Sequence, residues 1–501
     1  MAAVSPRSEA SPAARLSPRL ARLADLASNE LLLIAFFVAI AFMGLFDLSG
    51  GFAADSWLTL LGGREILAHG IPHRDSLAIL SHGRSWIDQQ WLAQLFFYGL
   101  YRLGGFGLVL RTNVLLYLAP LVICLVAARR RGASPICVLL IGLGLLFTGT
   151  FVRAQVLAQL PFVLMLLLLL AESRRPSRRV VLAVPLLVLW ANLHGAVVVG
   201  AALAAGLGAV ELVRWARSGQ ARRPRSLARP VAPLVVPWLW VLATPYGLGI
   251  FDYYRGTIGN SQLGTYVTEW RSPTFLSVWG VPFFTLAFLA VFLWARRPRR
   301  LNGFELFALA FTLAGGLLAV RSIMWFYYTA AILLPALLQD VLPARDTSRL
   351  PARDRQFRAG VAAAGLALVL VLFVRPMDSL ATHWPDGATR TVSRVLEQDP
   401  SAKVLSNEMY ADWLLFSVPG TRGRIAFDGR WEILSSAQFG TAMQFLFQRG
   451  ADWDVGGRGY RLLVLHPRRD ANLVTIFHVR RHWRVLYQDK LVIVLDRGAK
   501  R

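Results

Sequence analysis

The sequence predicts a polytopic α-helical membrane protein that ends in a small α/β domain, and three observations predict this class. Of the 501 residues, 55% are hydrophobic and only 17% are charged, whereas about a quarter of the residues in a soluble protein are charged. Several apolar runs reach the roughly 20 residues that a helix needs to cross a bilayer. These runs fall within residues 31–376, whereas residues 377–501 have the composition of a soluble domain.

Eleven membrane-spanning helices are expected in the first part of the chain. Their predicted ranges are 31–49, 107–128, 135–151, 155–172, 180–192, 195–213, 231–251, 275–295, 303–320, 322–342 and 359–376. The segment 91–104 is apolar but too short to cross, so we expect a helix in the membrane interface or half of a re-entrant hairpin. Residues 1–30 are rich in Ala, Ser, Pro and Arg, which is typical of a disordered tail.

The basic residues predict the orientation in the membrane. The net charge is +25 and comes almost entirely from Arg. The Arg residues cluster in alternate segments between spans, such as 129–131 and 296–300, as the positive-inside rule requires of cytoplasmic segments. We therefore expect a multi-pass protein of a bacterial inner (plasma) membrane with its N-terminus in the cytoplasm. An odd number of spans then places the C-terminal domain outside. Nucleic-acid binding is not expected, because no basic face with interleaved aromatic residues is present.

The C-terminal domain, 377–501, alternates strand-like and helix-like runs. Strands are predicted at 402–406, 423–427, 461–466, 483–487 and 491–496, and helices at 409–416, 435–449 and 471–481. This alternation is typical of a small α/β layer, which closes on a hairpin with its turn at 488–490. We expect residues 385–501 to fold on their own.

The first outer segment, 51–90, holds carboxylates next to the outer leaflet. Asp55 directly follows the first span, where an unpaired carboxylate is costly. Such a group can coordinate a divalent metal or act as a base on a hydroxyl acceptor. Asp75 is a second candidate carboxylate, whereas Asp88 is expected to be solvated. Trp57 is a candidate for substrate contact, although it fits an interfacial aromatic belt equally well.

Further polar residues fall at the outer ends of other predicted spans. They are Arg153, Gln155, Asn192, His194, Tyr246, Glu269, Trp270 and Arg321. Arginine is the fork-shaped partner of phosphate groups, so two Arg, a His and a carboxylate on one face suit an anionic, lipid-linked ligand. Taken singly, each Arg could equally reach outer lipid headgroups. Because outer charges are few, we favour a site with Glu269 as a further catalytic carboxylate and the other residues as substrate contacts.

Several short motifs resemble the GT-C superfamily of membrane glycosyltransferases, and within it a large bacterial multi-pass branch. The motifs that carry the resemblance are Asp55-Ser56-Trp57, Trp190-Ala191-Asn192-Leu193-His194-Gly195, Glu269-Trp270-Arg271-Ser272-Pro273, Asp428-Gly429-Arg430 and the pattern Trp483, Tyr487, Asp489. Two motifs depart from the pattern of that branch. Arg153-Ala154-Gln155 lacks a central Pro, and Thr244 replaces an Asn before Pro245-Tyr246-Gly247. Neither change removes the Arg or the Tyr, and the motifs span nearly the whole chain.

This resemblance implies transfer of a sugar from a polyprenyl-phosphate-linked donor to an acceptor glycan, lipid or protein at the outer face. Asp55 would be the base or would bind a divalent metal such as Mg²⁺ or Mn²⁺, with no other cofactor, and the Arg residues would hold the donor phosphate. Membrane lipids are the remaining expected partners. The Trp-Trp-Asp signature of oligosaccharyltransferases is absent from the tail, so N-glycosylation of sequons is not expected.

Two other classes remain open at the level of sequence. A transporter or flippase for polyprenyl-linked glycans would show an internal repeat and charged or broken helices at the midplane, and neither feature is evident. A non-catalytic assembly protein would use the tail to bind a partner, and Asp55 would then be dispensable. We expect Asp428 and Arg430 to form a structural pair inside the tail.

Overall fold

The fold is described by a computed structural model. It covers residues 29–46, 52, 55–148, 152–217, 227–258, 261–342, 352–375 and 384–498. The predicted disordered tail, 1–30, lies almost entirely outside these ranges, and so does the predicted domain boundary at residue 377.

Each of the eleven predicted spans contains a helix. The helices of the bundle are α2 (Leu31–Phe46), α4 (Trp91–Arg130), α5 (Pro135–Gly142) continued by η2 (Leu143–Phe147), α6 (Val156–Arg174), α7 (Ala183–Leu193) after η3 (Arg178–Leu182), α8 (Val197–Arg217), α9 (Ala228–Val241), α12 (Gly280–Arg296), α13 (Gly303–Leu318), α14 (Ile323–Gln339) and α15 (Ala352–Val374). Five described helices are long and apolar enough to cross a membrane, and five shorter helices of 10–17 residues are also apolar. The predicted class of a polytopic membrane protein is confirmed.

Helix α14 lies at the centre of the bundle. All but two of its 17 residues are buried, and it contacts α4, α5, α12 and α13. The ring of Trp325 packs against Phe162 of α6 and Trp190 of α7, with centroid distances of 4.7 and 6.1 Å. Close packing of this kind holds helices together where lipid replaces water. It also fixes the position of Arg321, which lies just before α14 in the 3₁₀ turn η8 (Val320–Ser322).

The predicted short helix at 91–104 is confirmed as the first part of α4. The helix is interrupted at Gly104 and Gly105, and Gly105 has φ +61° and ψ −162°, a backbone conformation that is essentially restricted to glycine. The residues before this break pack against α3 (Asp55–His69). Gly63 permits this close approach, because a Cβ there would lie 2.3 Å from the carbonyl oxygen of Gln94.

An ion cluster ties together the helix ends at the basic side of the bundle. Glu305 of α13 is fully buried and pairs with Arg131 after α4 and with Arg174 at the end of α6. Asn302 and Glu305 also form a capping box at the start of α13, which satisfies two backbone donors of the first turn. Because the carboxylate has two Arg partners, its burial is compensated.

The C-terminal unit contains a four-stranded sheet of order β1-β2-β4-β3. Its elements are α16 (Asp386–Gln398), β1 (Val404–Ser406), α17 (Glu408–Ser417), α18 (Ser436–Phe447), β2 (Leu462–Leu465), α19 (Ala471–Val474), β3 (Arg484–Gln488) and β4 (Ile493–Asp496). β1 pairs parallel with β2, and the other pairs are antiparallel. The predicted hairpin turn is confirmed, since Asp489 Oδ1 accepts bonds from the amides of Leu491 and Val492. Helix α16 was not predicted.

The predicted strand at 423–427 is wrong, because this segment forms only isolated bridges. Ile425 forms one isolated parallel bridge with Val404 and another with Ala78 of the first outer segment. The amides of Ile79 and Leu80 donate to the carbonyls of Ile425 and Ala426, at 2.8 and 3.0 Å. The segment 423–427 therefore joins the sheet to the first outer segment. An isolated tail would lose these bonds, which weighs against the expectation that it folds alone.

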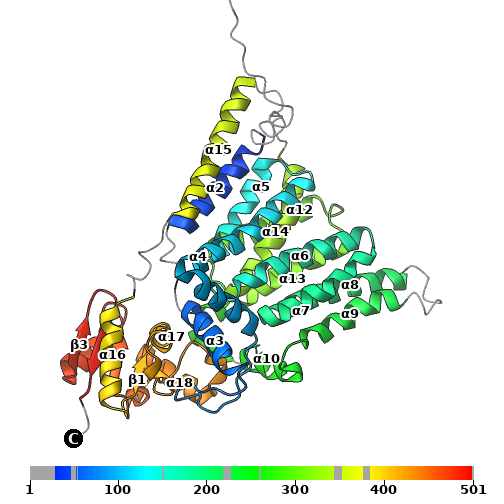
Figure 1. The fold of residues 1–501 in the computed structure, drawn as a ribbon. Coiled ribbons are helices and arrows are strands. Elements are labelled where there is room, and N and C mark those ends of the chain that lie inside the picture. The colour runs from blue at the N-terminus through cyan, green and yellow to red at the C-terminus, as the bar shows by residue number, and fades with distance from the viewer. Residues whose placement is uncertain are drawn as a thin grey trace, which may run out of the picture.

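Figure 1 shows how this junction is arranged. The sheet-containing unit lies at one end of the helical bundle, with α17 and α18 towards α3 and with α10 (Ile250–Ile258) nearby. Helix α17 contacts α3, and the turn at Trp431–Ile433 contacts α10. Residues far apart in the sequence therefore meet between the bundle and the C-terminal unit.

Candidate active site

A cavity of about 290 Å³ lies at this junction. Of the eleven predicted site residues, seven line it. These are Asp55, Arg153, Gln155, His194, Glu269, Trp270 and Arg321. They come from segments that are separated by up to about half of the chain, and the bundle brings them to one end.

Arg153 joins two of the three predicted catalytic carboxylates, Asp55 and Glu269. Its Nε lies 3.0 Å from Oδ2 of Asp55, and its Nη1 donates to Oε1 of Glu269. Burial disfavours the charged guanidinium, but the two carboxylates outweigh burial and raise the pKa of Arg153. Asp55 lies in the first turn of α3, where the helix dipole favours a negative charge. The side chains of Asp55 and Glu269 keep 45% and 40% of their exposure, so both carboxylates remain accessible from the cavity.

Arg321 is held differently. Its Cζ lies 4.4 Å from the ring centroid of Trp270, which is a cation–π contact. Among the residues that the structure describes, no carboxylate forms an ion pair with Arg321. Stacking on Trp270 thus fixes the orientation of the Arg321 guanidinium, and its positive charge is available to an anionic ligand.

His194 is neutral rather than cationic. It caps the end of α7 and is buried, and its Nδ1 accepts a bond of 3.0 Å from the amide of Ala196. Burial, followed by the charges of Arg321 and Arg153, lowers the pKa of His194 to about 3. His194, a predicted substrate contact, thus lines the cavity as a neutral imidazole. Two arginines, rather than two arginines and a histidine, supply positive charge from the bundle.

The C-terminal unit closes the cavity with residues that sequence reasoning missed. Glu408, in the first turn of α17, and Glu432, in the turn after Arg430, both line it. Burial raises the pKa of Glu408, and burial raises the pKa of Glu432 to about 7. The only signal in the sequence was the motif Asp428-Gly429-Arg430, whose last two residues also form part of the wall.

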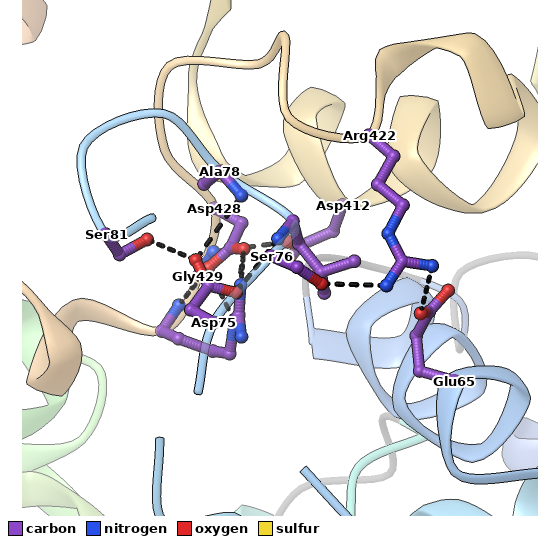
Figure 2. Close-up of polar contacts among 11 residues, drawn as sticks. Glu65, Asp75, Ser76, Ala78, Ser81, Asp412, Arg422, Asp428 and Gly429 are labelled. Carbon is purple, nitrogen blue, oxygen red and sulfur yellow. Dashed lines mark hydrogen bonds and ion pairs between the residues drawn. The ribbon is translucent and has the colours of Figure 1, made fainter. Parts of the chain in front are cut away.

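A buried ion network positions Arg430, and Figure 2 shows the carboxylates and the loop around it. Arg430 donates from Nε to Asp428 at 3.0 Å and pairs through Nη2 with Asp75 at 2.8 Å. Its Cζ lies 4.2 Å from the ring centroid of Trp86. Asp75 also accepts a 2.6 Å bond from the hydroxyl of Ser81. The expected pair within the tail is therefore part of a network that includes the first outer segment.

Asp75 was predicted to be catalytic, but the structure places it outside the cavity. It is only 2% exposed and lies in contact with Arg430. Burial works against its charge, but Arg430 and the bond from Ser81 lower its pKa. In the same network, burial and the charge of Asp428 raise the pKa of Asp412, whose Oδ1 accepts a bond from the amide of Gly429. Asp75 thus fits the role of positioning Arg430.

Three further predicted residues also lie away from the cavity. Asn192 accepts a 2.9 Å bond from Nε1 of Trp91 and donates to the carbonyl of Ala243. The hydroxyl of Tyr246 donates to the carbonyl of Pro72 at 2.8 Å. Trp57 lines a different cavity on another side of α3. Asn192 and Tyr246 therefore connect outer loops, and they have no direct role in the arrangement around Asp55.

The residues around Asp55 do not fit a divalent metal. In the described part of the chain, no group of three or more His, Cys, Asp or Glu side chains is placed to hold a metal ion. The carboxylate of Asp55 instead faces the guanidinium of Arg153.

Comparisons with known proteins give a likeness of overall fold. The sequence matches no protein-family model and no curated protein. Two solved structures of ArnT from Cupriavidus metallidurans, one bound to undecaprenyl phosphate and one in the apo state, resemble the chain with TM-scores of 0.46 and 0.45. Each is 16% identical, and each alignment covers 93% of this chain and 98% of that chain. A likeness at this level carries no information about donor, acceptor or residue roles.

Proposed function

We propose that the protein is a membrane glycosyltransferase that moves a sugar from a polyprenyl-phosphate-linked donor to an acceptor hydroxyl at the outer face. One observation carries the proposal. The same cavity contains an accessible carboxylate pair bridged by Arg153 and a stacked Arg321 that has no carboxylate partner among the described residues. A transfer that uses a base and releases a phosphate requires both features.

Arg321 is the proposed binding group for the donor phosphate. A guanidinium can donate two parallel bonds to a phosphate, and the Trp270 ring leaves the edge of the Arg321 fork free for such bonds. Arg153 is less suited to this role, because its Nε and Nη1 already pair with Asp55 and Glu269. The sequence did not distinguish the two arginines, and the geometry favours Arg321.

Asp55 is the proposed base. The acceptor hydroxyl would give its proton to the Asp55 carboxylate while its oxygen bonds to the anomeric carbon of the donor sugar. The bond from that carbon to the phosphate oxygen breaks, and the electron pair leaves with the polyprenyl phosphate, whose negative charge Arg321 offsets. Arg153 keeps the carboxylates of Asp55 and Glu269 in fixed directions, so that little reorganisation is needed during the reaction.

We propose that the cavity lies on the outer side of the membrane, and the distribution of Arg between the predicted spans supports this orientation. A reporter that is active only outside the cytoplasm should therefore be active when fused after residue 376. The same reporter should be inactive when it is inserted within 214–230. Activity in the opposite pattern would contradict the proposed orientation of the cavity.

Donor binding tests the assignment of the phosphate site. We expect Arg321→Ala to weaken binding of a polyprenyl phosphate to the protein in nanodiscs by roughly 2–5 kcal/mol, since a desolvated charge contact is lost. Arg153→Ala should have a smaller effect on binding. Arg255→Ala is a matched control, because Arg255 is 83% exposed and its one ion-pair partner among the described residues is Asp252 in its own helix. Unchanged binding by the Arg321→Ala protein would remove Arg321 from the site.

A further inference from the structure

A second cavity, of about 430 Å³, lies between α3, the start of α4 and the C-terminal unit. It shares no lining residue with the candidate active site. The first turn of α3 separates the two cavities, because Asp55 and Leu58 line the active site while Trp57 lines the second cavity. A helix with its side chains is about 10–12 Å wide, so the distance between the two cavities is of about this size.

Aromatic rings form most of the wall, and we call this space the aromatic cavity. Its aromatic lining residues are Phe52, Trp57, Tyr98, Tyr101, Phe106, Trp384, Trp413 and Phe416. The ring of Trp57 lies 5.2 Å from Trp384 and 5.4 Å from Phe416, and Tyr101 lies 5.5 Å from Phe416. The bundle and the C-terminal unit each supply part of this wall, so the aromatic cavity exists only when the two are joined.

Polar groups share the wall with the rings. Arg64, Asp386, Thr389 and Ser417 also line the aromatic cavity. Arg64 donates to the carbonyls of Leu415 and Phe416 at 2.8 and 2.7 Å, which fixes its guanidinium. A cavity for a hydrocarbon chain does not need a carboxylate, a guanidinium and two hydroxyls. The lining is instead typical of a site for a ligand with both apolar faces and polar edges.

Trp57 provides a second, independent observation. This side chain is 4% exposed, and its indole N–H has no hydrogen-bond partner among the described residues. A buried donor without a partner is energetically costly. A hydrocarbon chain in the aromatic cavity would leave this donor unsatisfied, whereas a ligand with hydroxyl or ring oxygens could accept from it.

We propose that the aromatic cavity binds a sugar ring of a glycan acceptor. A pyranose has apolar C–H faces that pack on aromatic rings, and hydroxyl groups around its edge that bond to polar side chains. The inference rests on the proposed function in one respect, namely that the bound glycan is the acceptor. One turn of α3 separates the two cavities, so an acceptor that occupies the aromatic cavity and also reaches Asp55 must carry several sugars.

Saccharide binding without donor tests this proposal directly. The full chain in nanodiscs would be applied to an array of immobilised hexose, hexosamine and deoxyhexose oligosaccharides. We expect binding to a subset of these glycans, and we expect Tyr101→Ala and Trp384→Ala each to weaken it by about tenfold, as the loss of one aromatic contact would. Both side chains are only partly buried, so the variants should fold. Phe447→Ala is the matched control, because Phe447 is 50% exposed and lines neither cavity.

The outcomes separate this proposal from the proposed function. Loss of saccharide binding in both cavity variants, with polyprenyl phosphate binding unchanged, supports a sugar site in the aromatic cavity. Failure of the wild-type protein to bind any glycan on the array, or binding that both variants retain in full, would overturn it. If glycans bind at this cavity but no sugar is ever transferred, the aromatic cavity stands and the glycosyltransferase assignment fails.

Discussion

Asp88 is a buried carboxylate at the edge of the outer segment, and its environment opposes its charge. The side chain is 2% exposed, its Oδ1 accepts a 3.0 Å bond from Nε2 of Gln94, and its Oδ2 has no partner among the described residues. Burial raises the pKa of Asp88 to about 7. The expectation of a solvated Asp88 is therefore wrong. The sequence placed this residue in a polar loop, and the packing of α4 against α3 removes it from water.

This pKa shift predicts how stability depends on pH. In the unfolded chain Asp88 ionises near pH 4, but in the folded protein it stays protonated up to about pH 7. The contribution of protonated Asp88 to the free energy of unfolding is therefore fully present below about pH 4, and it is lost as the pH rises through 7. Asp88→Asn should remove this loss, worth on the order of 2–4 kcal/mol at most, and should raise the apparent melting temperature at pH 8 but not at pH 4.

Thermal unfolding of both proteins in one detergent, across that pH range, checks this prediction. Asp252→Asn serves as the control, because the Asp252 side chain is 71% exposed and should show no such effect. Equal melting temperatures of wild type and Asp88→Asn at pH 8 would show that the charged form of Asp88 is accommodated at no cost.

Some residues of the candidate active site could be predicted from the sequence, and others could not. Asp55, Arg153, Glu269 and Arg321 could be predicted, because charged residues at the outer ends of spans are costly and few. Glu408 and Glu432 could not, because only the docking of the C-terminal unit partly buries them and brings them to the cavity. Nothing in their local sequence distinguishes them from surface carboxylates.

At the scale of elements, the break in α4 separates its short outer helix from the helix that follows. Gly105 has a positive φ, and the position where its Cβ would be is open. The cost of a side chain there is therefore conformational rather than steric. The part of α4 before this break packs against α3, and α3 carries both Asp55 and Trp57.

We expect Gly105→Ala to destabilise the protein by about 1–3 kcal/mol. Gly99→Ala is the matched control, since Gly99 lies in the regular helix before the break and also has open space at its Cβ. There the added methyl should be neutral or should stabilise the helix by about 0.5–1 kcal/mol. Apparent melting temperatures in detergent measure both effects. A loss of similar size in the two variants would mean that the conformation of Gly105 is not required.

The elements themselves were predictable where a local pattern decides them. Apolar runs located all eleven span helices, and strand propensity located four of the strands. The segment 423–427 has the same apolar pattern as a strand, but its neighbours on both sides bond to it through single bridges. Its pairing with residues 78–80 depends on a contact across about 350 positions, and periodicity carries no information about such a contact.

At the scale of the whole molecule, the candidate active site belongs to neither part alone. The bundle supplies Asp55, Arg153 and Arg321, and the C-terminal unit supplies Glu408 and the wall around Gly429. Arg422 strengthens the junction, because it pairs with Glu65 of α3 at 2.8 Å and donates to the hydroxyl of Ser76 at 2.7 Å (Figure 2). The sequence predicted the two domains. It did not predict the cavity between them, because that cavity depends on how the domains pack together.

Sugar transfer by the Asp55→Asn protein tests the central claim most directly. The measurement is transfer from a polyprenyl-phosphate-linked donor by purified protein in nanodiscs, with donor binding followed in the same samples. The substitution keeps the size of the side chain but removes the base, so transfer should fall by roughly a hundredfold to ten-thousandfold, while donor binding stays near wild type. Asp252→Asn should leave both unchanged. Wild-type transfer rates from Asp55→Asn would contradict the role of Asp55, and movement of the donor across a bilayer by the wild-type protein without any transfer would contradict the enzyme itself.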